Sequence, residues 1–173
     1  MGAATKSLAQ LGLTARGGRD VALTGLAVDS RDLRPGYLFA ALPGTKVHGA
    51  TFVATALEMG ATAILTDPEG AQIAAPVLAT QDAALVVAED PRATLSAAAA
   101  LWFGAQPATM VAVTGTNGKT SVSTFCRQLW VAMGHAAVNL GTTGVEGAWE
   151  APLKHTTPEP ITLHRTLAAA AAE

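Results

Sequence analysis

Residues 110–133 restrict the possible folds of this 173-residue chain more than any other segment. A short apolar run, 110–113, is followed by a glycine-containing loop that ends in Lys119-Thr120, and this loop leads into a helical pattern. In that pattern, apolar residues recur three and four positions apart and share one face: Val122, Phe125, Cys126, Leu129, Trp130 and Met133. Gly134 follows as a helix stop. The segment therefore predicts a strand over 110–114, a tight loop and an amphipathic helix over 120–133.

The loop between this strand and this helix has the form that proteins use to hold nucleotide phosphates. Gly115 and Gly118 let the backbone approach a phosphate, and the N-terminus of the helix adds partial positive charge. Lys119 is predicted to pair with the β- and γ-phosphates, and the hydroxyl of Thr120 to coordinate Mg²⁺. Asn117 has two interpretations. Either it contacts the nucleotide, or it holds the turn through its tolerance of a left-handed backbone.

Composition excludes several protein classes. Half of the residues are hydrophobic and 14% are charged, which is enough for a buried core and far from a disordered chain. The net charge is −2 and there is no basic run, so nothing indicates nucleic-acid or membrane-surface binding. No stretch predicts a signal peptide or a membrane span. The single cysteine, Cys126, is interpreted as a core residue, and a cytoplasmic protein without disulfides is expected.

Short strand and helix patterns alternate upstream of the loop. Strands are predicted over residues 23–28, 37–42, 61–66, 76–78 and 85–87, and helices over 52–59 and 92–103. The second helix has Asp90 as its N-cap and Pro91 at its first position. We therefore expect an α/β fold, with a small N-terminal domain over residues 1–107.

Downstream of the loop, the pattern predicts a strand over 136–140, a polar hairpin or loop over 145–154, and a helix with Thr157 as N-cap and Pro158 at its first position. Residues 108–173 are thus expected to begin a Rossmann-like ATP-binding domain. Such sheets have about five or six strands, and this segment supplies two. The domain is predicted to be incomplete, so that the chain is a fragment or is completed by another chain.

Several motifs occur in one order over nearly the whole chain. They are DSR at 29–31, RPGYLFAALPG at 34–44, HG at 48–49, TGTNGKT at 114–120, GTTG at 141–144 and TTP at 156–158. The loop carries Val113 where the generic nucleotide loop has glycine, and in this form it resembles the ATP loop of the Mur ligases and of folylpolyglutamate synthase. The full order resembles the Mur ligases, and within them the MurE group. Tyr37, Val47-His48-Gly49 and His155 depart from the family pattern.

The resemblance implies an ADP-forming amide ligase of peptidoglycan precursor synthesis that uses ATP and Mg²⁺. The γ-phosphate would activate the D-Glu carboxylate of UDP-N-acetylmuramoyl-L-Ala-D-Glu as an acyl phosphate, which the amine of a diamino acid then attacks. The diamino acid is predicted to be meso-diaminopimelate, with L-lysine as the alternative. The first domain would bind the uridine nucleotide.

The resemblance also implies a role for each matching residue. The ATP phosphates would be held by Gly115, Thr116, Asn117, Gly118, Lys119, Thr120 and Ser121, with Lys119 and Thr120 in catalytic roles and Thr120 on the metal. The substrate would be contacted by Val28, Ser30, Thr45, Lys46, Val47, His155, Thr156 and Thr157.

The residues alone leave other readings open. DSR at 29–31 is also typical of a turn closed by its own side chains or by an Asp29–Arg31 ion pair, and Thr157 of a helix cap. His48, His135 and His164 are interpreted as surface or packing residues. The alternative functions are a MurF-type ligase, folylpolyglutamate synthase, and a non-catalytic module that binds the UDP-linked substrate. The chain is expected to be inactive by itself, and its oligomeric state is not predicted.

Overall fold

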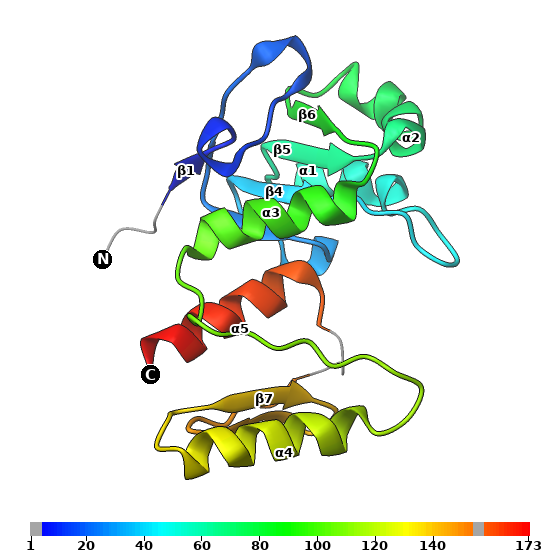
Figure 1. Cartoon of the computed structure of the whole chain (residues 1–173). Coiled ribbons are helices and arrows are strands. Elements are labelled where there is room, and N and C mark those ends of the chain that lie inside the picture. The colour runs from blue at the N-terminus through cyan, green and yellow to red at the C-terminus, as the bar shows by residue number, and fades with distance from the viewer. Residues whose placement is uncertain (1–4, 154–157) are drawn as a thin grey trace. The chain divides into compact units, whose positions relative to one another are not determined.

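The computed structural model describes residues 5–153 and 158–173, and the chain divides into two compact units, residues 1–102 and 103–173 (Figure 1). Both units combine helices with β-structure, which confirms the predicted α/β class. No helix among the described residues is long and apolar enough to cross a membrane.

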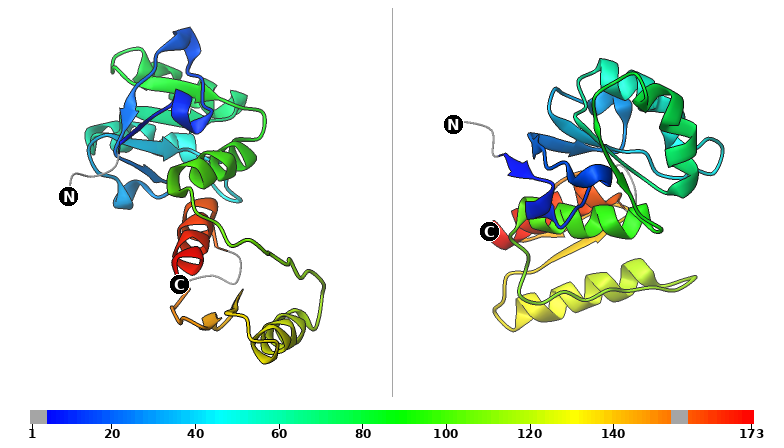
Figure 2. Two further views of the ribbon diagram at one scale, coloured as in Figure 1. Left: turned by 60° about the vertical axis from the view of Figure 1, so that its left-hand side comes forward. Right: turned by 90° about the horizontal axis from the view of Figure 1, so that it is seen from above.

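The first unit is built on a parallel four-stranded sheet with the order β3-β4-β5-β6 (Figure 2). Its strands are β3 (Gly25–Ala27), β4 (Tyr37–Ala40), β5 (Ala63–Thr66) and β6 (Ala84–Val87). Its helices are α1 (Val53–Glu58), α2 (Pro68–Leu78) and α3 (Pro91–Phe103), with short 3-10 helices η1 (Ala9–Leu11), η2 (Arg16–Gly18), η3 (Ser30–Asp32) and η4 (Gly49–Phe52). The core on one sheet face joins Phe39 and Ile64 to Val53 and Ala56 of α1 and Ala74 of α2.

Most strands of this unit follow the sequence prediction because they are continuous apolar runs. All four residues of β5 are buried, as expected for a parallel strand covered on both faces. The predicted strand 23–28 is divided in the structure. Its first part, β2 (Ala22–Leu23), pairs antiparallel with β1 (Lys6–Ser7), and β3 begins after Thr24, whose N–H donates to the carbonyl of Gly36.

The predicted strand over 76–78 is wrong, because these residues form the last turn of α2. The helix begins at Pro68 after Asp67, whose carboxylate accepts a hydrogen bond from the N–H of Gly70 at 2.7 Å. An N-cap aspartate followed by proline is a strong helix start. The helix then buries Ala71 and Ala74 and includes Pro76, a residue that ordinarily disfavours a helix interior.

Replacing Gly25 with alanine is expected to destabilise the first unit by about 1–3 kcal/mol, the usual cost of overpacking. Gly25 lies opposite Tyr37 in the β3–β4 register, and a Cβ at position 25 would stand 2.4 Å from the Tyr37 ring. Urea unfolding measures the effect. Gly141→Ala is the control, because a Cβ there has no neighbour within 4 Å. Equal unfolding midpoints for the two variants would contradict the prediction.

The second unit contains α4 (Lys119–Ala132), β7 (Val138–Gly141), β8 (Gly144–Gly147) and α5 (Pro160–Ala172). β7 and β8 form an antiparallel hairpin. The predicted helix after the loop is confirmed, and Gly134 follows it with a positive φ of 85°. The predicted strand over 110–114 is wrong: these residues are not in a strand. A strand requires a ladder partner, and among the described residues β7 pairs only with β8.

The start predicted for the last helix is also wrong. Pro158 precedes the helix, α5 begins at Pro160, and its N-cap is Glu159. The Glu159 carboxylate accepts hydrogen bonds from the N–H groups of Ile161 at 2.6 Å and Thr162 at 2.7 Å. Thr157, the predicted cap, lies outside the described residues.

The apolar face of α4 is largely open in this structure. Val122, Phe125, Leu129 and Met133 are all exposed, and Leu129 retains 64% of its accessible surface. Cys126, interpreted as a core residue, is half-buried.

Candidate nucleotide and substrate sites

The substrate residues predicted in the first unit lie at one edge of its sheet. Val28 and Ser30 follow the carboxyl end of β3, and the loop 43–47 follows the carboxyl end of the adjacent strand β4. Ligands of open parallel sheets bind outside the carboxyl ends of the strands. We call this edge the substrate edge. The structure thus brings Val28, Ser30, Thr45, Lys46 and Val47 to one side of the sheet.

The turn after β3 is held by the side chain of Asp29. Its carboxylate accepts the backbone N–H of Arg31 at 2.9 Å and binds the Arg31 guanidinium, with Nε at 2.9 Å and Nη2 at 2.5 Å. This hydrogen bonding and the charge of Asp29 raise the pKa of Arg31 above its ordinary value. Both structural readings of this motif, the closed turn and the ion pair, are present. Ser30, which lies between Asp29 and Arg31 in the sequence, is half-buried.

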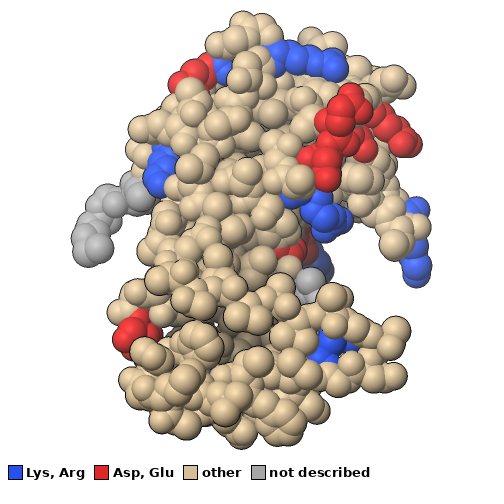
Figure 3. Space-filling model, in the orientation of Figure 1, with Lys and Arg blue, Asp and Glu red and all other residues tan. Residues whose placement is uncertain are grey.

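The loop after β4 is exposed between two fixed ends. Residues 43–47 are all exposed, whereas the N–H of Gly49 donates to the carbonyl of Leu42 at 2.9 Å and closes the loop. Lys46 and Val47 therefore present an ammonium group and an apolar side chain to solvent. On the face of the molecule drawn in Figure 3, most residues are uncharged and charged side chains are few.

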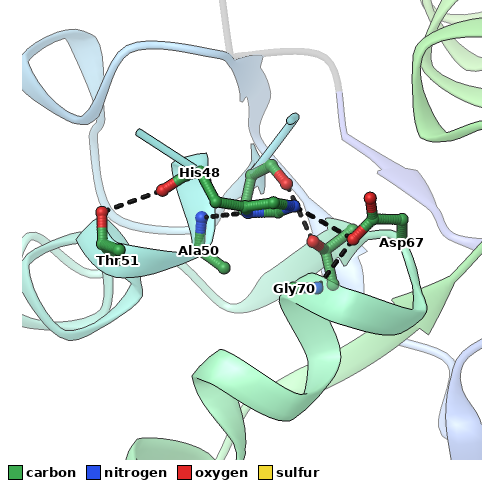
Figure 4. Close-up of polar contacts among 7 residues, drawn as sticks. His48, Ala50, Thr51, Asp67 and Gly70 are labelled. Atoms are coloured by element: carbon green, nitrogen blue, oxygen red, sulfur yellow. Dashed lines mark hydrogen bonds and ion pairs between the residues drawn. The ribbon is translucent and has the colours of Figure 1, made fainter. Parts of the chain in front are cut away.

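His48, interpreted from sequence as a surface or packing residue, is the centre of a polar network at the end of this loop (Figure 4). Its Nδ1 accepts the N–H of Ala50 at 3.0 Å, and its Nε2 lies 3.0 Å from Oδ1 of Asp67. Because Nδ1 accepts, the neutral ring carries its proton on Nε2 and donates it to Asp67. The side chains of His48 and Asp67 are only 10% and 17% exposed. Asp67-Pro68 signals a helix cap in the sequence, but nothing local signals the histidine partner 19 residues away.

The phosphate loop, residues 115–121, has the backbone that its glycines predict. Gly115 and Gly118 have φ values of 149° and 77°, and Gly118 is the N-cap of α4. The N-cap glycine makes no side-chain capping hydrogen bond, so it leaves the first N–H groups of the helix for an anion to bind. Among the described residues only glycines have positive φ, which rules out the left-handed role for Asn117.

Lys119 and Thr120 occupy the first turn of α4. The Nζ of Lys119 donates to the carbonyl of Gly115 at 2.5 Å, so the side chain folds back over the loop where a phosphate would lie. Lys119, Thr120 and Ser121 are exposed. The remaining predicted substrate residues, His155, Thr156 and Thr157, lie outside the described residues.

Sequence reasoning missed a hollow in the second unit. Its lining includes Arg127, Thr143, Glu146 and Glu150, and none of the predicted nucleotide residues. The Nε of Arg127 donates to Oδ1 of Asn139 at 2.6 Å, which joins α4 to β7. Of these residues only Thr143 lies in a sequence motif, GTTG at 141–144.

Two family models match this chain in sequence. The Mur ligase family catalytic domain matches residues 22–102, and the Mur ligase middle domain matches residues 113–173. The chain belongs to the Mur ligase family. The resemblance predicted from the ordered motifs is therefore confirmed, and both the substrate edge and the phosphate loop lie within the matched residues.

Two curated relatives and one solved structure illustrate the similarity, and all three carry the same enzyme name. This Mur ligase chain is 45% identical over 155 residues to the UDP-N-acetylmuramoyl-L-alanyl-D-glutamate--2,6-diaminopimelate ligase of Brucella melitensis, covering 89% of the chain and 30% of the relative. The ligase of that name from Caulobacter vibrioides is 50% identical over 127 residues, which are 73% of the chain and 24% of the relative. A solved structure of a ligase with this name superposes with a TM-score of 0.66 at 26% identity, covering 87% of this chain and 30% of that one. The chain thus spans about 30% of the length of such relatives.

Proposed function

We propose that this chain is part of an ATP-dependent ligase that joins meso-diaminopimelate to UDP-N-acetylmuramoyl-L-Ala-D-Glu in peptidoglycan precursor synthesis. The observation that carries the proposal is the 45% identity, over 89% of the chain, to a relative named for this reaction. An uncapped helix N-terminus behind a Gly-Lys-Thr loop supports it independently. We propose the cytoplasm, which supplies ATP, as the compartment of the reaction.

In the proposed reaction, the phosphate loop holds ATP while its γ-phosphoryl group moves to the D-Glu carboxylate. A carboxylate is a poor electrophile, and phosphorylation supplies a leaving group. The protein contributes mainly position and charge in such transfers. The N–H groups of residues 115–121 hold the phosphate oxygens, and Lys119 exchanges the Gly115 carbonyl for the transferring phosphoryl group.

The first turn of α4 offers chemistry that fits Mg²⁺. Thr120 presents an exposed hydroxyl beside the place proposed for the phosphates, and Mg²⁺ prefers hard oxygen ligands together with phosphate oxygens and water. When bound, the ion would neutralise charge on the transferring phosphoryl group. Thr120 is the residue of this chain that we propose to hold it.

The substrate edge is proposed to bind the uridine end of the substrate. Val28 and Ser30 would contact the uridine nucleotide, together with Thr45, Lys46 and Val47 in the exposed loop. His155, Thr156 and Thr157 would contact the muramoyl-dipeptide. In functional terms, residues 1–107 form the UDP-substrate domain and residues 108–173 begin the ATP-binding domain.

A ligation assay on the full-length protein tests the reaction. ADP release is expected only when ATP, Mg²⁺, UDP-N-acetylmuramoyl-L-Ala-D-Glu and meso-diaminopimelate are all present, with L-lysine a poor replacement. UDP-N-acetylmuramoyl-L-Ala, which lacks the D-Glu carboxylate, is the control and should support no release. A folded protein that binds ATP but releases no ADP with the full mixture would overturn the proposal.

A second candidate applies to the 173-residue chain by itself: a module that binds the UDP-linked substrate without catalysis. It is favoured by the substrate edge, whose residues all lie within the first unit. Isothermal titration of this chain with the UDP-linked dipeptide, with UDP and with ATP·Mg²⁺ measures binding. Saturable UDP binding with no turnover supports the module, whereas turnover by this chain alone would contradict it.

A further inference from the structure

The exposed loop 43–47 is anchored at both ends by two consecutive residues, Thr66 and Asp67, at the end of β5. Before the loop, the carbonyl of Ala41 accepts a hydrogen bond from Oγ1 of Thr66 at 2.8 Å. After the loop, His48 donates to Asp67 at 3.0 Å. Thr66 ends β5 and is fully buried, and Asp67 caps α2. The loop that follows β4 is therefore fixed to the β5–α2 junction at its entry and at its exit.

The anchor after the loop, the His48–Asp67 hydrogen bond, is held in place because each of its two side chains makes a further hydrogen bond. Oδ1 of Asp67 accepts the N–H of Gly70 at 2.7 Å while it accepts from His48, so the rigid first turn of α2 orients the carboxylate. On the other side, His48 Nδ1 accepts from Ala50, and the carbonyl of His48 accepts from Oγ1 of Thr51 at 2.8 Å. The ring thus bridges η4 and α2 with both nitrogens in use.

We propose that His48 and Asp67 are positioning residues for the loop that carries Thr45, Lys46 and Val47, which their hydrogen bond holds ready for the nucleotide part of the substrate. The proposal rests on the assignment of this loop to UDP binding. Neither side chain need contact the ligand. A loop fixed before binding loses less conformational freedom when the ligand arrives, and this raises affinity.

Two substitutions break the anchor from opposite sides and spare the local caps. His48→Asn keeps an oxygen for the N–H of Ala50 but does not reach Asp67. Asp67→Ser keeps a good N-cap for α2 but does not reach His48. His48→Gln is the conservative variant, because its amide N–H₂ extends to the position of Nε2. His135→Asn, on an exposed histidine of the second unit, is the matched control.

Titration of the 173-residue chain with the UDP-linked dipeptide is the first readout. His48→Asn and Asp67→Ser should each weaken binding on the order of tenfold, the scale of the cost of ordering one or two loop side chains when the ligand binds. The double variant should be no weaker than either single one, because both remove the same bond. His48→Gln should restore most of the affinity, and ATP·Mg²⁺ binding should not change. A purely structural role would not give this selective loss and rescue.

Limited trypsin digestion gives a readout that does not depend on UDP binding. Lys46 lies in the exposed loop, and mass spectrometry identifies cleavage after it. Cleavage should accelerate in both single variants because the loop opens more often. If cleavage is faster in the variants but the wild-type chain does not bind UDP, the anchor is supported and the assignment of the loop to UDP binding is overturned. Unchanged cleavage and unchanged UDP affinity in folded variants would overturn the anchor.

Discussion

Lys119→Ala in the full-length ligase is expected to lower kcat for ADP release by about 10²–10³-fold, the usual cost of removing one group that stabilises transition-state charge. Lys119 opens α4, and its ammonium already lies 2.5 Å from the carbonyl of Gly115 inside the loop. In the absence of this charge, the phosphate loop retains its N–H groups and the proposed Mg²⁺ ligand but has no side-chain cation at the γ-phosphate. Lys119→Arg should recover little, because a planar guanidinium does not replace a compact ammonium.

Gln128→Ala, an exposed position on the same helix, is the control for the Lys119 variant and should turn over normally. Binding of the UDP-linked dipeptide should also be unchanged in Lys119→Ala, which shows that the first unit is intact. Turnover of Lys119→Ala within a few-fold of the wild type would remove this lysine from the chemistry.

Gly70→Ala is expected to have the largest effect on stability, at the upper end of the range for overpacking or beyond it, about 3 kcal/mol or more. A Cβ at this position would lie 2.0 Å from Oγ1 of Thr66 and 2.5 Å from Cε1 of His48. Both atoms belong to buried, hydrogen-bonded side chains, so neither moves without breaking a bond. Urea unfolding of the first unit, followed by UDP binding, measures the loss.

Glu69→Ala is the matched control for Gly70→Ala, because Glu69 is the exposed neighbour in the same helical turn. Removing the Glu69 carboxylate should lower the free energy of unfolding by no more than about 1 kcal/mol, the scale of a charge near a helix N-terminus. A Gly70→Ala variant as stable as Glu69→Ala would show that α2 shifts to accommodate the methyl group.

Elements defined by local chemistry were predictable from the sequence. Helix α3 begins where Asp90-Pro91 places it, with Asp90 Oδ1 accepting from the N–H groups of Arg92 and Ala93. Helix α4 follows from the spacing of its apolar residues and ends before Gly134. In both cases the deciding contacts lie within four residues, so a short window contains all of the signal.

Elements that depend on distant partners were not predictable. The apolar run 110–113 has a strand composition but lacks a ladder partner among the residues that the structure describes. Residues 76–78 have a strand composition too, but the cap nine residues upstream of them sets a helix. The phosphate loop was found because all of its parts are consecutive. The His48–Asp67 pair was missed because its geometry exists only after β4 and β5 align side by side.

The anchoring of the loop after β4 has a consequence for how new specificities arise in this fold. The residues that fix the loop, Ala41 and His48, stand outside the exposed segment 43–47 and contact Thr66 and Asp67 at the end of β5. The exposed side chains of Thr45, Lys46 and Val47 can therefore be replaced without refolding the sheet, whereas Gly44 is held by the backbone of Val47, 2.4 Å from where a Cβ would stand. Mutation of this segment, by evolution or by design, can therefore change which ligand is recognised while the anchoring hydrogen bonds on either side of it are retained.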